Sequence, residues 1–156
     1  MQTLLFRLAA TWTILGLASG LGYRELTRSH DFDGRTQLAV AHTHALVLGT
    51  VMMLVLLVLD RVYDLASERG AVAGVWIYNA GVLVTVTMLV VNGSRQVLGT
   101  EEVPAALAGI SGTGHMTISL GLILLFLALG GAVRREATGS DVPQAGGSAA
   151  EVSSAS

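Results

Sequence analysis

Long uncharged intervals divide the chain. No Asp, Glu, Lys or Arg occurs within residues 8–23, 36–59, 70–94 and 103–133. Each of the last three exceeds the roughly 20 apolar residues that a helix needs to cross about 30 Å of hydrocarbon at about 1.5 Å per residue. The first interval is shorter, but apolar residues extend it beyond Arg7, whose long side chain can reach the membrane surface. The pattern predicts an all-α integral membrane bundle of four transmembrane helices.

The predicted helices cover about residues 1–22, 36–59, 73–91 and 103–133, and polar connections separate them. The first helix has a second interpretation, because the small residues Ala18-Ser19-Gly20 at its end also suit a signal-peptide cleavage site. We favour a retained helix, since Arg7 interrupts the apolar run and the spacing of Gly16 and Gly20 suits close packing against another helix.

Composition agrees with a membrane protein. Hydrophobic residues make up 52% of the chain and charged residues only 13%, well away from the balance of soluble domains. A net charge of −2 and the lack of a basic run argue against nucleic acid as a partner. Residues 134–156 end in a Gly-, Ser- and Ala-rich stretch, which predicts a transmembrane domain over 1–133 and a disordered tail over 134–156.

Three histidines lie inside the apolar intervals. His42 and His44 interrupt the second, and His115 follows a glycine-rich stretch, residues 109–114, in the fourth. Ionisable groups within a membrane usually face the bundle interior and mark a functional site. The second and fourth helices start from the same side of the membrane, so we expect the three histidines to lie at a similar depth within it. His42 and His44 point about 200° apart on a helix, so one of them either lies between protomers or bonds to a backbone carbonyl.

This set of histidines suits haem b. Two neutral imidazoles can supply the axial nitrogens, the glycine-rich stretch can admit the flat macrocycle, and Arg24 and Arg95 can neutralise the propionates. The chain has no cysteine, which excludes thiolate ligation and covalent haem attachment. Copper or zinc held by His42, His44 and His115 is the alternative cofactor. A plain helix contact would equally explain the glycines.

Other functions remain open at this point. The histidines could be buried hydrogen-bond donors in a non-catalytic structural or accessory membrane protein. Together with threonines of the third helix, His42 and His44 could instead line a conduit for protons or small solutes. We assign Asn79, Thr85 and Thr87 in that helix to interhelical hydrogen bonds. None of these patterns assigns an enzymatic reaction.

Several motifs in order resemble a family of small bacterial four-helix membrane proteins of unknown function. They are Tyr23-Arg24-Glu25-Leu26-Thr27, His42-Thr43-His44, Tyr78-Asn79-Ala80-Gly81 and Ile110-Ser111-Gly112-Thr113-Gly114-His115. The resemblance covers about residues 3–133. It implies a multi-pass protein of the bacterial inner (plasma) membrane.

His42-Thr43-His44 with Gly49 is also similar to an element of NnrS-type membrane proteins, which are related to haem–copper oxidase catalytic subunits. Those subunits look like three four-helix arcs, so the similarity implies a homo-oligomer, with a trimer as one form. The copper-ligand and cross-linked Tyr pattern of the oxidases is otherwise missing from the chain, which argues against oxygen reduction. We therefore predict an oligomeric membrane protein that binds haem b through His115 and one of His42 and His44. Its role would be electron transfer or the sensing or handling of a diatomic gas.

Overall fold

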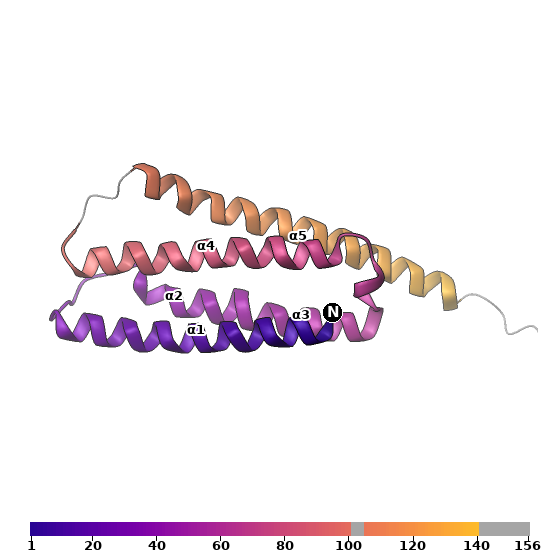
Figure 1. The fold of residues 1–156 in the computed structure, drawn as a ribbon, viewed down its shortest axis with the longest axis horizontal. Helices are drawn as coiled ribbons and strands as arrows, with labels where there is room; N and C mark the ends of the chain where they lie inside the picture. The colour runs from indigo at the N-terminus through magenta and orange to yellow at the C-terminus, as the bar shows by residue number, and fades with distance from the viewer. Residues whose placement is uncertain (101–104, 141–156) are drawn as a thin grey trace, which may run out of the picture.

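The computed structural model describes residues 1–100 and 105–140, with side chains described for 1–100 and 109–138. Its elements are α1 (Gln2–Ser29), α2 (Leu38–His44), the π-helix η1 (Ala45–Val51), α3 (Met52–Tyr63), the 3-10 turn η2 (Leu65–Ser67), α4 (Ala71–Val97) and α5 (Ala105–Ser140) (Figure 1). The elements α2, η1 and α3 follow without a break and are called the second helix below.

Four of these segments are long and apolar enough to cross a membrane. They are Gln2–Ser29, Leu38–Tyr63, Ala71–Val97 and Gly109–Thr138. The chain is therefore a multi-pass membrane protein, and the predicted fold class is confirmed.

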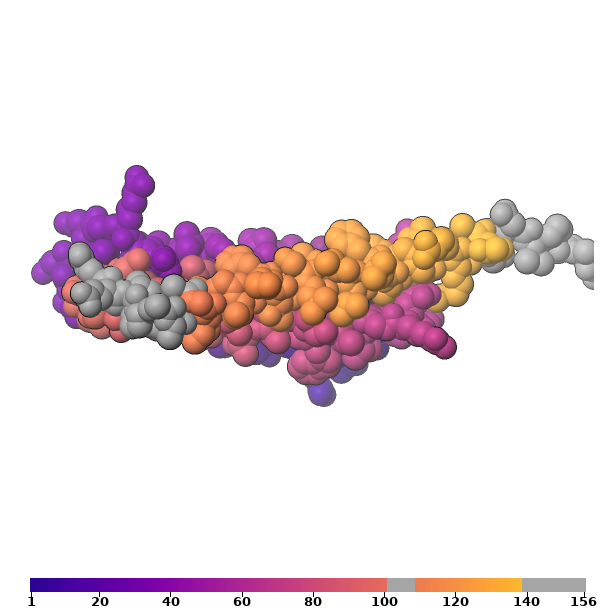
Figure 2. Space-filling view, turned by 90° about the horizontal axis from the view of Figure 1, so that it is seen from above, coloured from indigo at the N-terminus to yellow at the C-terminus, as the bar shows by residue number. Residues whose placement is uncertain are grey.

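The four helices form an open arc. Within the described residues, α1 packs on the second helix, the second helix packs on α4, and α4 packs along α5. No Cα atom of α1, α2 or η1 lies within 8 Å of the described part of α5, which touches α3 and η2 near one end only. Figure 1 shows α5 crossing α4 diagonally, and Figure 2 shows its outer side uncovered. The second helix and α5 therefore diverge from each other over α4.

Hydrogen bonds in the core connect α1, the second helix and α4. The Trp12 indole N–H donates to Asn79 Oδ1 over 2.8 Å, and the Asn79 amide donates to Val75 O over 2.8 Å. The Tyr78 hydroxyl donates to Leu48 O, in the π-helix, over 3.0 Å. All three polar side chains are buried, and this network confirms the packing role predicted for Asn79.

Close backbone approach joins α4 to α5. A Cβ atom added at Gly121 would lie 2.5 Å from the Tyr78 backbone nitrogen, and one at Gly81 would lie 2.5 Å from that of Ile118. Small residues let helices approach in this way in lipid, where there is no hydrophobic drive for helix association. Glycines on both helices thus hold α5 against α4.

Helix ends differ from the predicted bounds. Residues 23–29, predicted as part of a loop, continue α1, because this polar stretch contains neither Gly nor Pro. Residues 134–140, assigned to the disordered tail, continue α5. There Arg135 pairs with Glu68 and donates to Tyr63 O and Asp64 O, which fixes α5 to the end of α3. The tail predicted over 141–156 lies outside the described residues.

Candidate functional site

A cavity of about 420 Å³ lies between the start of the second helix, α4 and α5. His115 lines it, together with the polar residues Gln37, Thr85, Asn92 and Ser111 and the apolar residues Met88 and Leu89. Each of these three segments contributes at least one polar residue to the lining of the cavity. The cavity therefore combines apolar walls with polar groups from three segments, and it contains one of the three predicted histidines.

Two hydrogen bonds fix the wall formed by the second helix. The Thr36 hydroxyl donates to Gly93 O over 2.8 Å, and the Gln37 backbone N–H donates to Gln96 Oε1 over 2.7 Å. Gly93 permits this contact, because a Cβ there would lie 2.1 Å from the Leu38 nitrogen. The first turn of α2 is thereby held against the last turns of α4.

Two buried polar atoms belong to residues that line the cavity. Thr85 and Asn92 are only 3% and 5% exposed, yet Thr85 Oγ1 and Asn92 Oδ1 have no hydrogen-bond partner among the described residues. The Asn92 amide donates to Ser111 Oγ over 3.4 Å. Neither atom is accessible to solvent, and Thr85 Oγ1 lies against Gly114, where an added Cβ would be 2.5 Å away. These two atoms are therefore enclosed by the helix packing beside the cavity.

His44 and His115 have the same ring arrangement. His44 Nδ1 lies 2.9 Å from Val40 O, and His115 Nδ1 lies 3.4 Å from Ser111 O. A carbonyl can only accept, so each Nδ1 carries a proton in these contacts, which leaves Nε2 as the nitrogen that can bind a metal. Histidines that bind metals are commonly oriented by such a carbonyl contact.

The register of α2 places His44 on the cavity side of the second helix. His44 follows Gln37 by seven residues, which is about two helical turns, and Gln37 lines the cavity. His44 itself is not among the lining residues, and it lies deeper along the helix than Gln37. By this register His44 shares a side of the second helix with Gln37, while of the two histidines only His115 lines the cavity.

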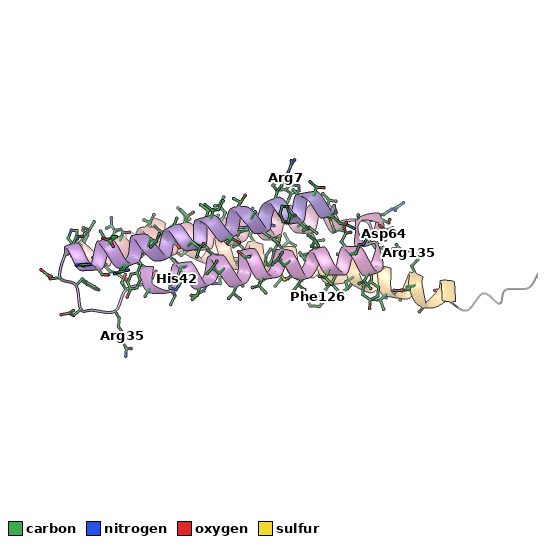
Figure 3. The ribbon with its side chains drawn as sticks, turned by 90° about the horizontal axis from the view of Figure 1, so that it is seen from below. Arg7, Arg35, His42, Asp64, Phe126 and Arg135 are labelled. Carbon is green, nitrogen blue, oxygen red and sulfur yellow. The ribbon has the colours of Figure 1, made fainter. Side chains whose placement is uncertain are left out.

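His42 has different surroundings. Its ring packs beside Gly20 of α1, where an added Cβ would lie 3.7 Å from His42 Cγ, and Figure 3 shows it on α2 next to α1. His42 Nδ1 is buried and has no hydrogen-bond partner among the described residues. The structure therefore separates His42 from the cavity that His115 lines.

The two predicted arginines are separated in the same way. Arg95 follows Asn92 by three residues in the last turn of α4, close to one helical turn nearer the membrane surface. Arg24 is exposed on α1, four residues after Gly20, and hence on the His42 side. Within residues 1–100 and 105–140, no group of three or more His, Cys, Asp or Glu side chains is placed to hold a metal ion.

The sequence leaves two explanations for the glycines before His115, a close helix contact and space for a flat ligand, and the individual glycines differ in which one applies. Gly114 makes a close helix contact, since a Cβ there would lie 2.5 Å from Thr85 Oγ1. A Cβ at Gly109 or Gly112 would meet no described atom within 4 Å. Gly114 is therefore explained by packing, whereas Gly109 and Gly112 leave open space along α5.

Sequence reasoning missed two residues of the cavity. Thr85 was assigned to interhelical hydrogen bonds, but its hydroxyl has no described partner, and Asn92 was placed in a connection. A signal was available, because Thr85 and Asn92 lie seven residues apart and therefore share one face of a helix. The same holds for Ser111 and His115, which are four residues apart.

No curated protein and no solved structure matched the chain significantly. A family model described as "Protein of unknown function (DUF2871)" matches residues 1–132, which covers all four transmembrane segments except the end of the last. The chain therefore belongs to this family of unknown function.

Proposed function

We propose that the protein binds haem b in the groove between the second helix and α5, with His44 and His115 as axial ligands. The observation that carries this proposal is the shared ring arrangement of these two histidines. In both, Nδ1 faces the carbonyl four residues earlier, so both present an Nε2 lone pair. His42 is the weaker candidate, because it packs against α1 on another side of the second helix.

The divergence of the helices supports the fit. His44 and His115 would hold the iron through Nε2, and the flat macrocycle would need space between the two helices that carry them. The α2 and η1 parts of the second helix, which carry or adjoin His44, lie more than 8 Å from the described part of α5 between Cα atoms. The polar cavity with its two unpartnered atoms opens at this same place.

The residues around the groove would have distinct roles. Met88 and Leu89 form an apolar wall against which the macrocycle would pack, and Arg95 would provide positive charge for a propionate. In this arrangement Arg24, which lies on the His42 side of the second helix and away from the groove, would not contact a propionate. Bound haem would supply one-electron redox chemistry or a binding site for a diatomic gas, and we propose electron transfer or gas sensing or handling as the function.

A homo-oligomer in the bacterial plasma membrane forms part of this proposal. The groove lies at the open side of the arc, and no described helix covers the outer side of α5 (Figure 2). His115 is itself exposed. A second copy covering this side, in a trimer or another assembly, would keep lipid from the edge of the haem.

The test is to purify the protein in mild detergent after expression with ample haem and iron. We expect a Soret band that shifts on reduction and close to one haem per chain. Stoichiometric copper or zinc without a Soret band would favour the alternative metal. The absence of both would overturn the proposal in favour of a structural or accessory membrane protein.

A further inference from the structure

We infer that the polar cavity is an aqueous vestibule, open at one end of the protein only, which admits water and small hydrophilic solutes as far as His115. This inference does not depend on haem binding, because it rests on the depth of the cavity, the polar residues within its lining and the apolar packing beyond it.

The cavity extends from the end of the bundle deep into the membrane. Gln37 lies at the first turn of α2, whereas Thr85 lies twelve residues before the last residue of α4, Val97. At about 1.5 Å per residue, Thr85 is about 18 Å from that end. A hydrocarbon core measures about 30 Å, so the polar lining passes through a large part of one leaflet.

Water suits this lining. Gln37, Ser111 and His115 line the cavity and are not buried, and a polar atom left unsatisfied within a membrane costs several kcal/mol. The cavity of about 420 Å³ greatly exceeds the roughly 30 Å³ that one water molecule occupies in the liquid. It also offers the two to four polar partners that a buried water needs.

The other half of the groove excludes water. A second cavity, of about 220 Å³, lies between α3 and α5, and every residue that lines it is apolar: Met52, Val55, Leu56, Leu59, Leu65, Leu122, Leu125, Phe126 and Leu129. Cavities of this kind stay dry. Between the two cavities Ile118 is buried against Gly81. The polar lining therefore ends near Thr85 and His115 and forms no path through the membrane.

Single cysteines test the vestibule cleanly, because the chain has no cysteine of its own. Gln37→Cys, Ser111→Cys and Asn92→Cys replace side chains that line the polar cavity. Phe126→Cys, in the apolar cavity, and Leu83→Cys, exposed on α4, are the matched controls. Each variant, reconstituted in vesicles, is treated with a membrane-impermeant cationic methanethiosulfonate reagent from one face and then from the other.

We expect the three cavity cysteines to react from the same single face, the one that also modifies His30→Cys in the α1–α2 connection. They should react at least about tenfold faster than the two controls, because the thiolate is the reacting species and an apolar environment suppresses its formation. Prior loading with haem should slow the reaction at Ser111→Cys and Asn92→Cys if haem fills the groove, whereas a failure to bind haem leaves the basal rates unchanged.

Two results would overturn the inference. The first is reaction of Ser111→Cys, the mildest change, at the rate of Leu83→Cys in protein that elutes as a single folded species. The second is modification of the cavity cysteines from both faces, which would mean a conduit through the membrane.

Discussion

The three membrane histidines differ in what their Nδ1 atoms contact. His44 and His115 are oriented by carbonyls on their own helices, whereas Nδ1 of His42 is buried without a described partner. Such a carbonyl contact selects the tautomer and holds the ring for a ligand on Nε2. The sequence predicts that the two histidines of the second helix point in different directions, but it does not reveal which of them has its ring fixed.

Alanine substitutions separate the two possible ligand pairs. We expect His44→Ala and His115→Ala to lose the Soret band or to change it to that of a haem with one axial ligand, because each removes a proposed ligand. His42→Ala should keep the spectrum of the unmodified protein. Visible spectra of the oxidised and reduced proteins measure this. Loss of the band in His42→Ala, with His44→Ala unaffected, would transfer the axial role to His42.

The Trp12 indole makes a buried hydrogen bond that Phe cannot make. Trp12→Phe leaves Asn79 Oδ1 without its donor, and leaving a buried acceptor unpaired costs about 1–3 kcal/mol. We expect a matching fall in the free energy of unfolding, measured by denaturant titration in detergent. Trp76→Phe is the control, since Trp76 is 54% exposed and surface substitutions usually change stability by less than about 0.5 kcal/mol. Equal effects of both substitutions would contradict the role of the bond.

At the scale of elements, the second helix contains a feature that hydropathy does not report. Residues Ala45–Val51 are π-helical, directly after His44. Gly49 lets Trp12 approach so closely that a Cβ would lie 2.3 Å from Trp12 Cγ, and Tyr78 bonds to Leu48 O. Trp12 and Tyr78, which contact the π-helix, are distant from it in the sequence. The uncharged interval therefore predicts that the second helix spans the membrane, but not that part of it is π-helical.

The seam between α4 and α5 depends on glycine. We expect Gly121→Leu to displace α5, because a side chain there meets the Tyr78 backbone and overpacking typically costs about 1–3 kcal/mol. Haem binding should weaken with it, since α5 carries His115. The measurements are size-exclusion behaviour and the Soret band.

Gly130→Leu is the control for this substitution, because a Cβ at Gly130 meets no described atom within 4 Å. It should behave like the unmodified protein. Full haem binding by Gly121→Leu would show that α5 can shift without loss of the site.

At the scale of the whole molecule, the number and order of the spans could be predicted, but not which spans touch. Four uncharged intervals are enough to predict four helices. The open arc results from contacts of particular small residues, such as Gly93 against Leu38 and Gly121 against Tyr78. The candidate site could also be predicted only in part. His115 can be identified from its position in an apolar interval, whereas the presence of Thr85 and Asn92 beside it depends on how the helices pack.

Haem binding should stabilise the folded protein by mass action, because the proposed ligands come from two helices that are held in place relative to each other only in the folded state. At a free haem concentration of 100 times Kd, the expected gain is about 2.7 kcal/mol. Thermal unfolding in detergent with and without haem measures it. The gain should vanish in His44→Ala, and an equal gain in that variant would indicate non-specific association of haem.

The attachment of α5 at one edge of the arc has a consequence for biogenesis. The Trp12, Asn79 and Tyr78 network lies entirely within the first three spans, so they can pack together while the ribosome is still making the fourth. His115 arrives with that last span. The groove is therefore completed only at the end of membrane insertion, so an unfinished chain lacks one of the two proposed haem ligands.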